Sequence, residues 1–84
     1  MDDKRPKKRS LTLRGHRTSV SLEDAFWKAF RQIAADQGKP INVLAAEIDA
    51  ARGIEPGLAS AIRLYVLEWY QARLGASGGD ISEK

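Results

Sequence analysis

The chain has 84 residues, a formal net charge of +3 and no cysteine. This length allows one domain at most, and the lack of cysteine excludes a disulfide framework and thiolate zinc sites. No apolar run reaches the roughly 18 residues of a transmembrane helix, and the charged N-terminus is followed by no apolar segment typical of a secretory signal. We therefore expect a cytoplasmic protein.

Positive charge is concentrated at the N-terminal end. Residues 1–20 carry seven Lys or Arg against two Asp, whereas residues 21–84 carry seven Lys or Arg against nine Asp or Glu. This asymmetry indicates a polyanionic partner, with nucleic acid the first candidate, and the alternative is a solvated basic tail. We expect residues 1–9 to be a disordered basic arm, whose Lys7, Lys8 and Arg9 would contact phosphates if the chain binds nucleic acid.

The segment 17–22 predicts a strand that runs straight into a helix. Its odd-numbered residues are polar and its even-numbered residues are largely apolar, so the strand has one polar and one apolar face. The polar residues are Arg17, Ser19 and Ser21, and the others are Thr18, Val20 and Leu22. We find no second strand downstream. We therefore expect a partner strand from a second copy of the chain, which makes a two-stranded antiparallel ribbon between two molecules.

Two features precede this strand. Leu11 and Leu13 also alternate, but in the opposite parity to Val20 and Leu22, and Gly15 is a natural place for a bulge or bend that resets the face. The two leucines would fold back onto a dimer core or extend the ribbon, and the sequence does not decide between these placements. His16, the only histidine, lacks ligand partners for a metal and either contacts a phosphate or is an edge or turn residue.

A first helix is predicted from about Glu23 to Gln37, ended by Gly38. Ser21 and the acidic residues after it fit a helix-opening pattern, so capping would occupy the Ser21 hydroxyl. We assign the aromatic residues of this helix to the core. They are Phe26, Trp27 and Phe30.

Two more helices follow. One should run from Pro40 or Ile41 to Arg52, closed by Gly53, with a turn over residues 55–57, and its first turn around Asn42 offers backbone N–H groups to an anion. The other should run over residues 58–74, and residues 75–84 should be a disordered tail. The third helix has a broad apolar stripe that must cover the core, extend a dimer interface or receive a partner protein.

The order strand, helix, turn, helix resembles the ribbon-helix-helix superfamily of DNA-binding proteins. The likeness is carried by residues 17–22, by the helix that starts Glu23-Asp24-Ala25-Phe26-Trp27, by the break 38–42 and by the helix with Leu44 and Ile48. Residues 13–27 more narrowly resemble a bacterial subgroup of such domains that carries a third helix. The resemblance implies a mainly helical fold with one strand per chain, over residues 10–74, in an intertwined homodimer.

The resemblance also implies residue roles. Superfamily ribbons enter the major groove of DNA, and the outward strand residues touch base edges, which maps to Arg17, Ser19 and Ser21. The start of the second helix clamps a phosphate, which maps to residues 40–42. These are Pro40, Ile41 and Asn42, and the proline stands where members often carry Ser or Thr, so one backbone donor is missing.

Two functions are therefore considered. The first is a sequence-specific DNA-binding dimer that regulates transcription, with phosphate contacts from Arg14, His16, Lys39 and the basic arm. The alternative is a protein-interaction module, such as an antitoxin, that uses the third helix. No catalytic constellation is present in the sequence, so we expect no enzyme, no cofactor and no metal.

Overall fold

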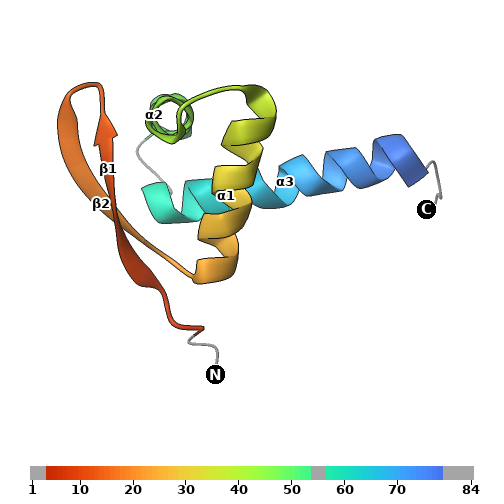
Figure 1. Cartoon of the computed structure of the whole chain (residues 1–84), viewed down its shortest axis with the longest axis horizontal. Coiled ribbons are helices and arrows are strands. Elements are labelled where there is room, and N and C mark those ends of the chain that lie inside the picture. The colour runs from red at the N-terminus through yellow and green to blue at the C-terminus, as the bar shows by residue number, and fades with distance from the viewer. Residues whose placement is uncertain (1–3, 54–56, 79–84) are drawn as a thin grey trace.

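The computed structural model describes residues 4–53 and 57–78. Two strands, β1 (Lys7–Leu13) and β2 (His16–Leu22), precede three helices, α1 (Asp24–Gln37), α2 (Ile41–Arg52) and α3 (Leu58–Gly78). The strands form an antiparallel pair at one side of the molecule, and α3 extends away on the other side (Figure 1). The expected mainly helical fold with a two-stranded antiparallel ribbon and a third helix is confirmed.

A two-residue turn joins the strands. Arg14 and Gly15 both have positive φ, at 54° and 83°. Successive positive φ values are typical of the type I′ turn, whose twist matches that of a β-hairpin. The chain therefore bends sharply at Gly15, as one of the predicted alternatives has it, and this bend is a two-residue hairpin turn that folds Leu11 and Leu13 back toward the core.

The strand that pairs with β2 comes from the same chain. β1 pairs with β2 along its whole length, from Leu13 opposite His16 to Lys7 opposite Leu22. The chain thus supplies a partner strand for β2 itself, and pairing of β2 with a second copy stays a prediction. The second strand lies upstream of β2, because a tight turn joins two strands without an intervening element. The homodimer stays a prediction, because the structure is that of one chain.

The hairpin register explains the parity of the leucines. Each odd residue of β1 is opposite an even residue of β2, and opposite residues of an antiparallel pair share a face. Leu11 and Leu13 therefore lie on the same face as Val20 and Leu22. Of these, Leu11, Val20 and Leu22 are buried, at 3%, 6% and 0% exposure. Both leucines thus belong to the ribbon, and Leu11 belongs to the core.

The basic arm is shorter than predicted, because residues 7–9 belong to β1. The Arg9 guanidinium donates to the carbonyl oxygen of Leu22 (3.3 and 3.2 Å) and to the Asp24 carboxylate, and it stacks on the Trp27 ring at 5.5 Å. Lys7 Nζ also contacts the Asp24 carboxylate, at 3.2 Å. These contacts fix β1 to the start of α1. Residues 1–3 lie outside the described part of the chain.

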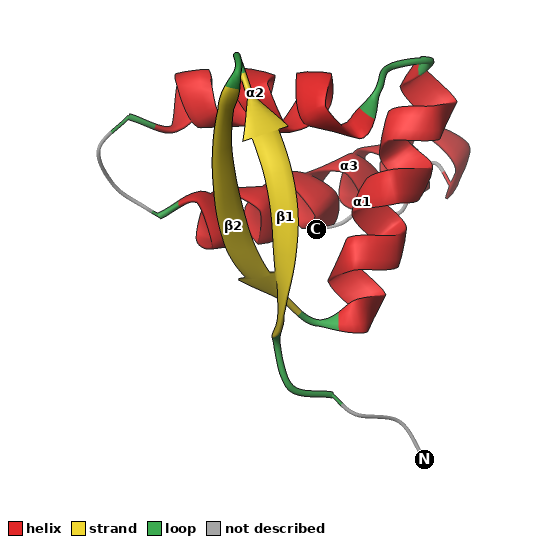
Figure 2. Ribbon diagram, turned by 60° about the vertical axis from the view of Figure 1, so that its left-hand side comes forward, coloured by secondary structure: helices red, strands yellow, loops and turns green. Residues whose placement is uncertain are grey.

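One hydrophobic core lies between the hairpin and the three helices (Figure 2). Phe30 of α1 is completely buried, and Phe26 and Trp27 are partly buried against the core, so the assignment of the aromatic residues is confirmed. The other helices add apolar residues at three- and four-residue spacing. They are Leu44, Ala45 and Ile48 from α2, and Ile62 and Val66 from α3.

The helix ends follow the sequence signals with two exceptions. Gly38 ends α1 in the left-handed region (φ 68°), as predicted, and its N–H bonds to the carbonyls of Ala34 and Ala35. Glu23 rather than Ser21 occupies the N-cap position of α1, and no side chain caps that end. The third helix continues to Gly78, past its predicted end at residue 74. Residues 55 and 56 of the predicted turn and residues 79–84 of the predicted tail lie outside the described residues.

Candidate nucleic-acid interface

The solvent-facing side of the hairpin, which we call the outer face, carries only polar side chains. Its six residues are Lys8, Ser10 and Thr12 from β1 and Arg17, Ser19 and Ser21 from β2, and all six are exposed. Figure 2 shows the hairpin in front of α2 and α3, with α1 beside it. Residues 7–22 contain five Lys or Arg and no Asp or Glu. The outer face therefore has no carboxylate of its own that would repel a phosphate backbone.

Ser21 is better placed than the sequence indicated. Because it lies in β2 and does not cap α1, its hydroxyl is not occupied by the helix. Its carbonyl oxygen accepts a bond from Arg63 Nη2 at 3.1 Å, and Arg63 Nε also donates to Glu23 at 3.0 Å. This bond from Arg63 holds the pKa of Glu23 below its usual value. The junction between β2 and α1 is thus anchored to α3, which fixes the end of the outer face.

The start of α2 retains donors for an anion. The N–H groups of Val43 and Leu44 reach the carbonyl of Pro40, at 3.0 and 3.1 Å. Within the described residues, the N–H groups of Ile41 and Asn42 have no acceptor, as expected for the first turn of a helix. Two donors therefore remain at this end even though Pro40 supplies none.

This helix end lies directly beside the hairpin. Asn42 Oδ1 accepts the backbone N–H of Thr12, at 3.0 Å. Thr12, Arg14 and Asn42 line one hollow of about 340 Å³, which Val43, Ala46 and Glu47 complete. The fold thus brings together Arg14 and Asn42, two of the predicted phosphate contacts. Lys39, a third, precedes α2 and pairs with Glu47 at 2.7 Å in an exposed ion pair of a kind that contributes little stability.

Three other predicted phosphate contacts are not on this surface. Lys7 and Arg9 lie on the helix-facing side of β1 and are bonded to Asp24, so the prediction that they belong to a free arm is wrong. His16 pairs with Leu13, also on the helix-facing side, and lines a different hollow with Asp49 and Arg52. Of Lys7, Lys8 and Arg9, the three arm residues predicted to contact phosphate, only Lys8 lies on the outer face.

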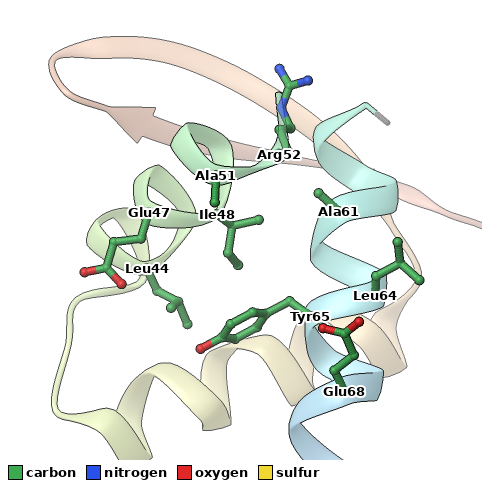
Figure 3. A pocket seen from close by; sticks show the side chains of 9 residues that line it. All are labelled: Leu44, Glu47, Ile48, Ala51, Arg52, Ala61, Leu64, Tyr65 and Glu68. Atoms are coloured by element: carbon green, nitrogen blue, oxygen red, sulfur yellow. The ribbon is translucent and has the colours of Figure 1, made fainter. Parts of the chain in front are cut away.

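A second surface lies on α3. Apolar side chains along this helix are exposed, at 51% for Leu64, 51% for Leu67 and 70% for Leu74. Beside them, α2 and α3 border a groove of about 310 Å³. Figure 3 shows Leu44, Ile48 and Tyr65 directed toward one another in this groove, with Glu47 and Glu68 at its rim. This surface is apolar, unlike the outer face, and suits a protein partner.

A comparison with protein families identifies the family of this chain. The family model for the ribbon-helix-helix domain matches residues 6–70. The chain belongs to the ribbon-helix-helix family. The matched segment includes both strands, α1, α2 and most of α3. Ribbon-helix-helix proteins are generally DNA-binding transcription regulators or antitoxins, and the domain is a regulatory module rather than an enzyme. Searches of curated proteins and of solved structures find no significant match.

The described residues add two negative findings. None of their helices is long and apolar enough to cross a membrane. They also contain no group of three His, Cys, Asp or Glu side chains placed to hold a metal ion.

Sequence reasoning missed half of the outer face. Ser10 and Thr12 were not among the predicted site residues, and Lys8 was assigned to an arm. The signal was available, because the opposite parity of Leu11 and Val20 is what a hairpin with a two-residue turn requires.

Proposed function

We propose that this ribbon-helix-helix protein is a sequence-specific DNA-binding transcription regulator that inserts its hairpin into the major groove. The observation that carries this proposal is the outer face, with six exposed polar side chains and no carboxylate. A major groove admits a two-stranded ribbon. Arg17 suits guanine O6 and N7, whereas the hydroxyls of Ser19 and Ser21 can donate to or accept from several bases.

Contacts around the outer face would supply affinity. We expect the DNA backbone beside the groove to be contacted by Arg14 at the hairpin turn, by Lys39 and by the N–H groups of Ile41 and Asn42. Lys8 lies opposite Ser21, at the end of the hairpin away from the turn, and we expect its side chain to contact a phosphate or a base. With about six neutralised phosphates in the complex, the logarithm of affinity should fall with the logarithm of salt concentration at a slope near −5.

We propose that the regulator acts as a dimer and that α3 contributes to its interface. The hairpin already pairs β2 with β1 of the same chain, whereas Leu64, Leu67 and Leu74 are exposed. Dimerisation there would bury these side chains, and it would set the spacing between two hairpins and hence between two half-sites. Sedimentation of Leu67→Glu against the parent tests this interface, and an unchanged mass would refute it.

The DNA-binding proposal is tested by selecting bound duplexes from a random library at about 150 mM salt, where nonspecific phosphate binding is weakened. We expect a short repeated or palindromic motif. Arg17→Ala should lose about 1–3 kcal/mol of discrimination at one base position per half-site. The matched control is Arg31→Ala, which removes an exposed arginine from α1, away from the hairpin, and should leave the motif unchanged. If no motif is enriched, or if Arg17→Ala selects the parent motif with parent affinity, the proposal is wrong.

A second candidate function is protein binding through α3, as in an antitoxin. The exposed apolar residues of α3 and the adjoining groove favour it. The two functions differ in protease sensitivity, because a segment that awaits its partner is often disordered when free. Rapid proteolysis of α3 in the isolated protein would favour a partner protein, whereas resistance would favour a closed domain.

A further inference from the structure

We propose that the groove between α2 and α3 binds a small apolar molecule with one positive charge, and that this ligand neutralises Glu47 and thereby strengthens DNA binding. The regulatory step rests on the proposed DNA binding, whereas the ligand site does not. The groove has a volume of about 310 Å³, at the lower end of the range for small-molecule sites.

The floor of the groove is apolar and held in place. Leu44 and Ile48 are buried members of the core, and their side chains point into the groove together with Tyr65 (Figure 3). The Tyr65 hydroxyl accepts a hydrogen bond from Gln37 Nε2 at 2.6 Å, which fixes the position of the ring. A ligand therefore meets a floor that needs little reordering, so its binding costs less conformational entropy.

The rim of the groove favours a cation. Each wall carries one carboxylate, Glu47 on α2 and Glu68 on α3 (Figure 3). Among the described residues, no basic side chain forms an ion pair with Glu68, whereas Arg52, also in the lining, is bonded to Asp49 at 2.9 Å. The ring of Tyr65 adds an aromatic face, which attracts a cation. Negative charge beside an apolar floor suits a protonated amine attached to an apolar group.

Glu47 connects this groove to the candidate phosphate site. It lines the groove and also the hollow of about 340 Å³ that contains Thr12, Arg14 and Asn42. Its Oε1 lies 2.7 Å from Lys39 Nζ, so it neutralises one of the cations that we expect to contact DNA. A carboxylate at this position also repels a phosphate. Glu47 therefore opposes DNA binding in the free protein.

Two pairings of Glu47 define the coupling between ligand and DNA. In the free protein Glu47 pairs with Lys39. With ligand bound it pairs with the ligand cation, which leaves Lys39 for a phosphate. Ligand and DNA thus favour the same state, so each raises the affinity of the other by the same factor. Because 50% of the Glu47 side chain is exposed in this ion pair, the factor should be only about twofold to fivefold.

Phenethylamine is the probe for the ligand site, because it joins a phenyl ring to a protonated amine. Two control compounds separate its features: phenylethanol has the ring without the charge, and ethylamine has the charge without the ring. We expect phenethylamine to shift the amide NMR signals of Leu44, Ile48 and Leu64 saturably, phenylethanol to do so with lower affinity, and ethylamine to have no effect. Glu68→Gln should weaken phenethylamine binding about twofold to fivefold and leave phenylethanol binding unchanged.

Two outcomes of this titration would overturn the ligand site. The first is equal affinity for phenethylamine and phenylethanol, or signal shifts that lie outside the groove. The second is loss of the shifts as the protein concentration rises, because a second copy of the chain would then fill the groove.

Glu47→Gln tests the coupling. It removes the charge and keeps the shape of the side chain, and the fold should stay intact because an exposed ion pair contributes little stability. In the parent, saturating phenethylamine should raise the affinity for the selected duplex about twofold to fivefold above its value in the same concentration of ethylamine, which matches the ionic strength. Glu47→Gln should show this higher affinity without the probe and no further rise with it. The control, Asp36→Asn, removes an exposed carboxylate that lines neither hollow and should behave as the parent.

The results separate the ligand site from the function. If the protein binds no duplex, the proposed function and the coupling are both wrong, while the NMR titration still decides the ligand site. If DNA binds but phenethylamine raises its affinity no more than ethylamine does, or if Glu47→Gln keeps the affinity of the parent, the coupling is overturned and the DNA-binding proposal stands.

Discussion

The substitution Leu11→Ala measures whether β1 is part of the folded core. Leu11 is 3% exposed and lies on the helix-facing side of the hairpin with Val20 and Leu22. Loss of three carbon atoms removes about 2.4 kcal/mol of transfer free energy, at about 0.8 kcal/mol per buried methylene. A residual cavity adds to this cost, although a two-stranded ribbon can collapse partly around the gap. We expect the free energy of unfolding to fall by about 2–3 kcal/mol, a large share of the roughly 4–13 kcal/mol typical of a domain of this size.

Urea denaturation followed by tryptophan fluorescence provides the measurement, at one fixed protein concentration because dimerisation would raise the apparent stability. With a slope near 1–1.5 kcal/mol per molar urea, the midpoint should fall by about 2 M. Ser10→Ala is the control, because its side chain is exposed on the outer face of the same strand and the change should cost under about 0.5 kcal/mol. Equal, small losses for both variants would show that Leu11 is not in the core and that the hairpin is wrongly placed.

Three further predictions concern the turn, the start of α1 and the phosphate contacts. Gly15→Ala should lower the free energy of unfolding by about 1–2 kcal/mol, because an L-residue is strained at φ 83°. The control is Gly57→Ala, at a glycine without positive φ, which should not destabilise the protein. Equal urea midpoints for the two variants would contradict the turn geometry. Hydrogen bonds from Arg9 and Lys7 hold the pKa of Asp24 below its usual value, so the stability that this carboxylate contributes is present above its unfolded-state pKa and is lost as the pH falls through its folded-state pKa. In the parent, the urea midpoint should be higher at about pH 7 than at about pH 2.5, and Asp24→Asn should make this difference smaller. If the variant shows the same difference as the parent, Asp24 does not contribute to the pH dependence of stability. Lys39→Ala should weaken binding to all DNA sequences alike, and the slope of log affinity against log salt concentration should become shallower by about 0.9. The control is Lys28→Ala, on the exposed side of α1, which should leave that slope unchanged. If Lys39→Ala has the slope of the parent, Lys39 does not contact a phosphate.

Local signals in the sequence were sufficient for the helices. α1 and α2 begin and end within a residue of their predicted limits, because Gly38 and Gly53 end them and Pro40 starts the second. The apolar stripes also identified the core of each helix, since burial on one face of a helix follows from its 3.6-residue period. Arg17, Ser19 and Ser21 were correctly placed on one exposed side of a strand by their alternation.

The sequence by itself thus determined the helices, the polar face of β2 and the cationic character of the N-terminal segment, because each depends on neighbours close in the chain. Only the tertiary structure decided what pairs with β2, which side of β1 is exposed and where Arg9 is bonded. These depend on the register between two strands and on contacts such as Thr12 with Asn42, which lie 30 residues apart. A shift of one residue in that register would exchange the two faces of β1. The hairpin turn and the burial of Leu11 exclude that shift, and they turn a segment predicted to be in part a disordered arm into half of the outer face.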